Sequence, residues 1–430
     1  YFVCCAIIKN MEDKNKIQVS ENLMKLAKKL KNKAELFIVG GYVRNSLLGF
    51  TATDIDLCSK LTPERLKEIL AGTNFVVKDK NKKLGTVTIS IGNEVYEHST
   101  FRMEEYDDSG KHCPVSVRFV DDIRQDAKRR DFTINCIYYS IMKNKIIDIY
   151  SGLYDLKKHR IKTIETPEFV FSKDGLRILR MIRVACELNF SIEKETFKIA
   201  NQMSYRLKDI TGIRKQKELL QILNCYKKYP ITKKGACIRA LNYFNSMQLW
   251  SFFYSTKSYI KLDMVKKNNL EKVSALLIDM INAINPECVE YYLRYMLGAK
   301  GFNFTNKQQD YYINIVSGYF DALNRINNKS YFLKYYDNFE EIGKYISSKH
   351  PFLFNKYNFF YKYLVNNHVP IRVKDLQVNG DDIKKYKSRM PEKYYGKLLK
   401  ELLSRVFDGE INNTREELIG EIKHYDYRNS

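Results

Sequence analysis

The chain has 430 residues, of which 44% are hydrophobic. This is enough to bury the cores of several domains, and it excludes a small scaffold held together by disulfides. Lysine and arginine number 73 against 50 acidic residues, and the formal net charge of +23 favours a polyanionic partner such as nucleic acid. No apolar run approaches the roughly 20 residues of a membrane-spanning helix, so we expect a soluble protein and no membrane partner.

The cysteine pattern indicates a reducing compartment. The count of nine is odd, no C-x-x-C pair occurs and no histidine lies nearby at ligand spacing, so we expect free thiols and no structural zinc. This favours an intracellular location over secretion. Because the chain begins with Tyr1, one interpretation of residues 1–8 is the end of a trimmed targeting segment, which keeps both the cytoplasm and an organelle open.

A buried strand, a tight turn and a short helix are predicted in succession near residue 40. Residues 36–39 predict the strand, the Gly40-Gly41 pair the turn, and residues 43–48 the helix. Free N–H groups at the start of such a helix bind phosphate, and Arg44 adds a bidentate donor. Taken alone, however, a Gly-Gly pair usually marks a turn with no binding function.

Two carboxylates follow at Asp54 and Asp56. Strand alternation places residues i and i+2 on one face, roughly 6.6 Å apart along the strand axis, so both carboxylates can hold metal together. Taken alone, such a pair is more often a solvated strand end. Its position directly after the strand, turn and helix favours a site for a nucleoside triphosphate and its metals.

The remaining elements divide the chain into two unequal parts. Short β-branched runs at residues 75–77, 86–91, 95–100 and 115–120 predict strands and hence an α+β region. After residue 155 the apolar spacing becomes helical, and the rest of the chain is predicted to be helical with interruptions near Pro230, Pro286, Pro351 and Pro370.

A second polar cluster ends the α+β region at Arg130 and Asp131, before an apolar run that extends through Met142. An aspartate before such a run is most often a helix N-cap. The functional interpretation is that Arg130 faces nucleotide phosphates while Asp131 accepts from ribose hydroxyls, including the 2′-OH that marks a ribonucleotide. The two roles can coexist.

A third cluster opens the first long helix, where Asp174, Arg177 and Arg180 are spaced three residues apart and Arg183 follows. Such a series is most often an exposed ion pair. The Watson–Crick edges of cytosine and adenine both carry an amine beside a ring-nitrogen acceptor, so a carboxylate and a guanidinium can satisfy either base. The Asp174/Arg177 pair therefore predicts selection of C and A without a nucleic-acid template.

These clusters, in this order, resemble class II tRNA nucleotidyltransferases, the bacterial-type CCA-adding enzymes of the polymerase β superfamily. The family's metal and triphosphate motif is matched by residues 40–44 and 54–56, its ribose motif by 129–135 and its base-template motif by 174–177. Glu97 matches the third carboxylate. Residues 151–156 and 160–161 resemble the hinge motif, residues 210–214 and 218–219 the neck motif, and residues 375–383 the tail motif.

The resemblance implies an α+β N-terminal nucleotidyltransferase head, a mixed β-sheet with helices, followed by an all-α neck, body and tail. The implied boundaries are an N-terminal extension at 1–33, the head at 34–150, the neck with the base-template helix at 151–225, the body at 226–330 and a tRNA-binding tail at 331–430.

It also implies template-independent addition of C, C and A to the 3′ end of tRNA from CTP and ATP, by two-metal phosphoryl transfer that releases pyrophosphate. Asp54 and Asp56 would hold the Mg²⁺ ions, and Glu97 would complete the catalytic site. Arg180 and Arg183 would stack or add phosphate contacts. The oligomeric state is left open. The implied nucleotide-binding residues are Gly40, Gly41, Arg44, Arg130, Asp131, Asp174, Arg177, Arg180 and Arg183.

The chain departs from the family at three positions. Lys173 stands where a glutamate commonly helps to orient the template arginine, which puts base fidelity in question. Asn45 replaces an aspartate after Arg44, and Ile213 replaces a glutamate in the neck motif.

Four alternatives remain open. A poly(A) polymerase shares the head, but its arginine-rich strand motif has no clear match around residues 84–92. A CC-adding specialist lacks the flexible loop that residues 102–118, with Tyr106 and Asp107, supply here. An A-adding specialist is a further alternative. A non-catalytic tRNA-binding protein is disfavoured because all three candidate carboxylates are present.

Overall fold

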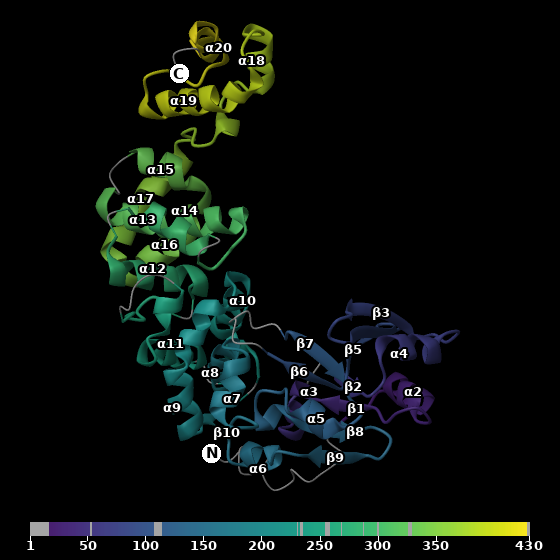
Figure 1. Cartoon of the computed structure of the whole chain (residues 1–430). Helices are drawn as coiled ribbons and strands as arrows, with labels where there is room; N and C mark the ends of the chain where they lie inside the picture. Colours follow the sequence, from purple (N-terminus) through teal and green to yellow (C-terminus); the bar gives the residue numbers. More distant parts are fainter. Residues whose placement is uncertain are drawn as a thin grey trace. The chain divides into compact units, whose positions relative to one another are not determined.

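The chain folds into two compact units, Tyr1–Lys257 and Ser258–Ser430, shown in Figure 1. The boundary between them lies inside the range 226–330 predicted as the body, and the finer division into head, neck, body and tail stays a prediction. Residues 1–8 and Asp107 lie outside the described part of the chain. The computed structural model describes residues 17–51, 54–106, 114–229, 231–232, 235–253, 259–267, 269–286, 288–298, 301–325 and 329–427.

A mixed seven-stranded sheet forms the framework of the first unit, in the order β3-β4-β5-β2-β1-β8-β9. All neighbours are antiparallel except β2 and β5, whose parallel register sets Asp56 beside Glu97. Phe37, Cys58 and Tyr138 pack in the core on this sheet. The strands are β1 (Phe37–Val39), β2 (Asp56–Ser59), β3 (Val76–Asn81), β4 (Thr86–Ile91), β5 (Glu94–Thr100), β8 (Ile137–Ser140) and β9 (Lys145–Asp148).

Short helices and a hairpin surround the sheet. The helix α2 begins where the Ser20 hydroxyl accepts from the Leu23 N–H, and α4 begins at a proline, which suits the first helical position. These elements are α2 (Glu21–Leu30), α3 (Gly41–Leu47), α4 (Pro63–Leu70), the hairpin of β6 (Arg102–Glu105) and β7 (Ser116–Phe119), α5 (Ile123–Ala127), the 3₁₀ turn η2 (Thr133–Asn135) and α6 (Gly152–Lys157).

Helices dominate the rest of the first unit, as predicted. Leu176, Leu179 and Ile182 form a buried stripe on α8, and Arg177, Arg180 and Arg183 follow them by one position each, on an adjacent face. The elements are β10 (Arg160–Ile161), α7 (Pro167–Lys173), α8 (Leu176–Glu187), β11 (Ser191–Ile192), α9 (Lys194–Gln202), η3 (Ser204–Asp209), α10 (Gly212–Leu223), η4 (Cys225–Lys227), α11 (Ala236–Ser246) and η5 (Leu249–Phe252).

The apolar run after Asp131 does not form the helix that an N-cap would require. It forms the short turn η2 and then the strand β8, whose β-branched and aromatic residues pair with β1 and β9. Phe132 precedes the turn, and no side chain caps it. Asp131 is therefore available for other contacts.

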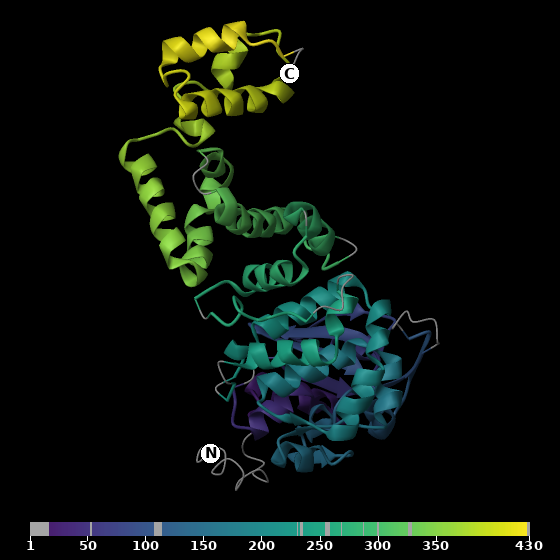
Figure 2. The same cartoon turned by 90° about the vertical axis from the view of Figure 1, so that its left-hand side faces the viewer.

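The described part of the second unit is helical (Figure 2). Pro351 occupies the first turn of α17, and the C-terminal helices enclose a core of their own around Leu402 and Leu418. No helix in the described ranges has both the length and the apolarity to cross a membrane. The elements are α12 (Lys272–Ile284), α13 (Val289–Leu297), α14 (Asn306–Arg325), α15 (Lys329–Tyr335), η6 (Tyr336–Asn338), α16 (Phe339–Lys349), α17 (Pro351–Asn366), η7 (Val373–Asp375), α18 (Gly380–Tyr386), η8 (Glu392–Tyr394), α19 (Tyr395–Asp408) and α20 (Arg415–His424).

Asp279 on α12 makes the stability of the second unit depend on pH. Its buried carboxylate accepts from the N–H groups of Met264 and Val265 at 2.8 and 3.0 Å, and burial raises its pKa to about 6. The folded state therefore binds this proton more tightly than the unfolded state, so the contribution is greatest at low pH and is lost as pH rises through about 6. We expect the free energy of unfolding to fall by about 1 kcal/mol more in the wild type than in Asp279→Asn between about pH 5 and 7, measured by urea titration. An equal fall in the free energy of unfolding of the wild type and of Asp279→Asn would contradict this prediction.

Candidate nucleotide-binding site

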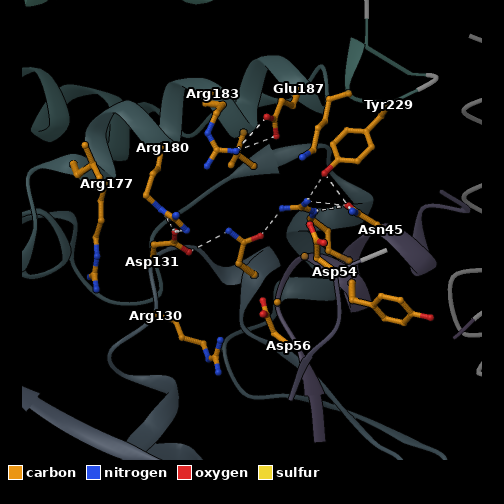
Figure 3. Close-up of a pocket in the computed structure, with 18 of the residues that line it drawn as sticks. Asn45, Asp54, Asp56, Arg130, Asp131, Arg177, Arg180, Arg183, Glu187 and Tyr229 are labelled. Atoms are coloured by element: carbon orange, nitrogen blue, oxygen red, sulfur yellow. Dashed lines mark hydrogen bonds and ion pairs between the residues drawn. The ribbon is translucent and has the colours of Figure 1, made fainter. Parts of the chain in front are cut away.

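A cavity of about 800 Å³ lies in the first unit, between the start of α3, the start of β2, the turn η2 and the polar side of α8 (Figure 3). It brings together every predicted nucleotide-binding residue and both predicted metal ligands. Glu97 is not among the lining residues. The residues lining it are Gly40, Gly41, Tyr42, Arg44, Asn45, Thr51, Asp54, Asp56, Arg129, Arg130, Asp131, Asn135, Asp174, Leu176, Arg177, Arg180, Arg183, Val184, Glu187, Arg214, Lys228 and Tyr229.

The backbone at Gly40 requires glycine. Its φ of 78° lies in the left-handed region, and a Cβ there would point at the Asp56 carboxylate, 3.6 Å from Oδ2. This turn places the start of α3 beside the carboxylates. The Gly-Gly pair is thus more than a connection, because Gly40 lies directly against the Asp56 carboxylate.

Arg44 is a buried guanidinium held entirely by neutral groups. It donates to the Asn45 Oδ1 atom at 2.8 and 3.0 Å, to the Asn135 Oδ1 atom at 2.6 Å and to the Tyr229 hydroxyl at 3.2 Å. Only 5% of the residue is exposed, and burial lowers its pKa. A buried cation without an ion-pair partner is a strong attractor for phosphate oxygens.

The two aspartates enter the cavity from the start of β2 (Figure 3). Reduced solvation raises the pKa of Asp56, the charges of Glu97 and Asp54 raise it further, and Arg130 opposes them. The Glu97 carboxylate itself forms an ion pair with Lys80 on β3. In the described ranges, no three His, Cys, Asp or Glu side chains come together as a metal-binding group.

The donor set nevertheless fits a hard divalent cation. Mg²⁺ is commonly bound through one or two carboxylates and takes its other ligands from water and substrate phosphates. The repulsion that raises the pKa of Asp56 is the kind of local charge imbalance that a cation beside Asp54 and Asp56 would offset.

Asp131 is fixed by four hydrogen bonds. Arg180 donates to its Oδ2 atom at 2.6 and 2.9 Å, while the Phe132 N–H and the Asn135 amide donate to Oδ1 at 2.8 and 3.1 Å. Burial alone would raise the pKa of Asp131, but the charges of Arg180 and Arg177 hold it well below its usual range. The carboxylate therefore stays ionised as a strong acceptor.

The side chains of the two predicted base-reading residues are held by other groups and do not bond each other, although the Arg177 N–H donates to the Asp174 carbonyl oxygen at 3.0 Å. Arg177 donates to the carbonyl oxygens of Val170 and Arg129 at 3.2 and 2.6 Å, and Asp174 accepts from Arg214 at 2.6 Å. Lys173 instead places its ammonium 3.8 Å from the centre of the Phe169 ring. Main-chain oxygens thus orient Arg177 in a chain that lacks the glutamate at position 173.

The remaining arginines of the cavity are paired with carboxylates. Arg130 binds Asp126 at 3.1 Å and also donates to Tyr138, and Arg183 binds Glu218 and Glu187 at 2.8 and 3.1 Å. Arg129, Arg180 and Arg214 also have carboxylate partners. Among the described lining arginines, only Arg44 and Arg177 are held by neutral acceptors alone.

Several of these contacts had no signal in the sequence. Tyr229 reaches Arg44 across 185 positions and stacks on Phe50, with ring centres 5.3 Å apart. Glu187 is on the arginine-bearing helix, but its role as a partner of Arg183 depends on side-chain direction. Asn135 belongs to the predicted ribose motif, although no role was predicted for it.

Comparison with known proteins shows which enzymes the chain resembles. Residues 36–162 match the family described as the Poly A polymerase head domain. The CCA-adding enzyme of Ligilactobacillus salivarius is 29% identical over 401 residues, covering 90% of this chain and 92% of that enzyme. The CCA-adding enzyme of Staphylococcus haemolyticus is 26% identical over 418 residues, covering 90% and 94%. The chain is similar to CCA-adding enzymes over nearly its whole length.

Solved structures show that the CCA-adding fold extends over nearly the whole chain. The Bacillus stearothermophilus CCA-adding enzyme in complex with CTP matches with a TM-score of 0.63 at 21% identity, covering 93% of this chain and 95% of that one. The Thermotoga maritima CCA-adding enzyme complexed with tRNA matches with a TM-score of 0.53 at 20% identity, covering 96% and 97%. The predicted α+β region followed by helices is therefore confirmed, and it is the fold of these solved enzymes.

Proposed function

We propose that this chain adds C, C and A in turn to the 3′ end of tRNA, using CTP and ATP and releasing pyrophosphate. The observation that carries the proposal is the set of groups that line the cavity. They are the carboxylates of Asp54 and Asp56, the buried Arg44 guanidinium without an ion-pair partner, the ionised carboxylate of Asp131, and the side chains of Asp174 and Arg177. Relatives named CCA-adding enzymes, one of them solved with CTP and one with tRNA, support this choice of substrates.

Each group has a distinct part in binding and orienting the substrates. Arg44 draws the triphosphate to the inner wall, where its charge has no competing carboxylate partner. Asp131 accepts from ribose hydroxyls. Asp54 and Asp56 hold Mg²⁺, with Glu97 adding negative charge beside them. When bound, two such ions supply charge stabilisation of the transferring phosphoryl group and activation of the attacking 3′-OH.

Base choice follows from hydrogen-bond complementarity. Asp174 accepts from the exocyclic amine of cytosine or adenine, and Arg177 donates to the adjacent ring nitrogen. Guanine and uracil present the opposite arrangement and leave both groups unsatisfied, which costs roughly 1–3 kcal/mol for each buried group. The contacts of Arg177 with main-chain oxygens and of Asp174 with Arg214 fix both groups before a base arrives.

The reaction can be tested with three tRNA substrates, ending before C, after the first C and after CC. With Mg²⁺ present, we expect the first two to require CTP, the third to require ATP, and each addition to release one pyrophosphate. No extension of any substrate would contradict the proposed function. The control for metal dependence is the same chain treated with EDTA, which should lose extension and regain it when Mg²⁺ is resupplied.

A poly(A) polymerase is the second candidate, because the matched head family carries that description. The two functions differ in how many nucleotides are added. An enzyme that extends a generic RNA with a long run of A, and that does not use CTP, would support the second candidate.

The binding of tRNA is proposed to depend on its phosphates. Exposed lysines crowd the C-terminal helices, including Lys384, Lys385, Lys393, Lys397 and Lys400, and the whole chain carries a net charge of +23. We expect tRNA affinity to fall at least about tenfold between about 50 and 200 mM salt, measured by fluorescence anisotropy, because bound cations are released from the phosphates. A flat response would contradict a phosphate-dominated interface.

A further inference from the structure

Asn135 joins the two halves of the cavity. We propose that it is a positioning residue that couples recognition of the ribose to recognition of the triphosphate. Each of the two contacts then contributes more to nucleotide binding when the other is made. The inference rests on the proposed function, since it assigns the ribose to Asp131 and the triphosphate to Arg44.

The geometry places one side-chain amide between the two recognition groups. The Asn135 Nδ2 atom donates to the Asp131 Oδ1 atom at 3.1 Å, and its Oδ1 atom accepts from the Arg44 guanidinium at 2.6 Å. Both partners are almost completely buried, with 5% of Arg44 and 6% of Asp131 exposed. Hydrogen bonds in such surroundings are little weakened by competition from water.

The chemistry of the two partners permits one orientation of this amide. A flipped amide would set its NH₂ group against the guanidinium and its oxygen against the carboxylate, and both contacts would be repulsive. Aspartate at this position would lack the donor, and leucine would lack both groups. A short amide therefore meets both requirements.

The coupling follows from this shared amide. A triphosphate that draws Arg44 into a fixed position also fixes the Asn135 oxygen, and with it the donor that orients Asp131. The other hydrogen-bond donors to Asp131 are Arg180 and the Phe132 N–H, and neither bonds to Arg44 in the described structure. Asn135 is thus the direct hydrogen-bonded link between the two groups.

Binding of four nucleotides to the full chain measures the coupling directly. CTP, dCTP, CMP and dCMP form a cycle in which the 2′-OH and the terminal phosphates are removed singly and together. By calorimetric titration in Mg²⁺ buffer, we expect the preference for CTP over dCTP to exceed that for CMP over dCMP by about fivefold, a size typical of groups that share a hydrogen-bond network.

Two variants distinguish the coupling role of Asn135 from a general effect of losing a partner of Arg44. Asn135→Leu should bring the ratio of the CTP/dCTP preference to the CMP/dCMP preference to about one. Asn45→Leu is the matched control, because Asn45 also accepts from Arg44 but its side chain is bonded to Arg44 and Tyr229 and not to Asp131 in the described structure. This variant should weaken CTP binding and keep the ratio. Asn135→Asp, which keeps the acceptor and loses the donor, should behave like Asn135→Leu.

The outcomes distinguish this inference from the proposed function. In the wild type, a preference for CTP over dCTP equal to that for CMP over dCMP would overturn the inference without affecting CTP binding or CCA addition. This test uses the wild-type chain alone, so it does not depend on the folding of a variant. A ratio unchanged in Asn135→Leu, or lost equally in Asn45→Leu, would also overturn it. A wild-type chain that binds neither CTP nor ATP would overturn the proposed function itself.

Discussion

Asp56→Asn is expected to lower the rate of nucleotide addition to tRNA by about 1,000-fold or more, while tRNA affinity stays nearly unchanged. The substitution keeps the size of the side chain and removes the charge that holds a cation. Asp56 is the first residue of β2 and lines the cavity of the first unit, whereas the basic C-terminal helices that we propose bind tRNA belong to the second unit. Single-turnover extension measures the rate, and anisotropy measures the affinity.

Asp79→Asn provides the matched control. It makes the same chemical change on the same sheet, at a carboxylate that pairs with Lys67 and Lys82 on the surface. The control should keep the wild-type rate. Extension by Asp56→Asn within about tenfold of the wild type would rule out the metal assignment, since loss of a metal-binding charge should cost several kcal/mol.

Arg177→Ala is expected to relax the choice of base. Without the guanidinium, cytosine and adenine lose a donor to the ring nitrogen, and the penalty against guanine and uracil falls. We expect the preference for CTP over UTP to fall by about 10- to 100-fold, which corresponds to one or two buried hydrogen bonds. The ratio of kcat/KM values for CTP and UTP on tRNA lacking CCA gives this preference.

Lys173→Ala is the control for Arg177. It removes a neighbouring positive charge that lies over the Phe169 ring instead of bonding Asp174 or Arg177 in the described structure. Because main-chain oxygens hold Arg177, base preference should persist in this variant. An unchanged CTP preference in Arg177→Ala, or a relaxed one in Lys173→Ala, would refute this account of base selection.

The parts of the site that sequence predicts well are those encoded over short distances. The turn at Gly40, the start of α3 and the aspartates near β2 follow from glycine freedom, apolar runs and strand alternation within about twenty residues. The three arginines of α8 were likewise placed by their spacing, and Figure 3 shows Arg177, Arg180 and Arg183 extending from that helix.

The contacts that sequence did not predict depend on side-chain direction across long separations. Asp174 is 40 positions from Arg214, and Asn135 is 91 positions from Arg44. The N-cap interpretation of Asp131 required a helix in the apolar run through Met142, but pairing with two strands made part of that run a strand. Tertiary pairing overrides local propensity in such short runs.

The most direct test of the central claim is the sequence of the 3′ ends that the wild-type chain makes. A tRNA lacking CCA would be incubated with all four nucleoside triphosphates and Mg²⁺, and the products sequenced individually. CCA addition predicts that extended ends read CCA and stop there, and selection by Asp174 and Arg177 predicts that the added bases are C and A alone. Long runs of A would contradict CCA addition, and ends containing G and U as often as C and A would contradict a cavity that chooses bases through its own side chains.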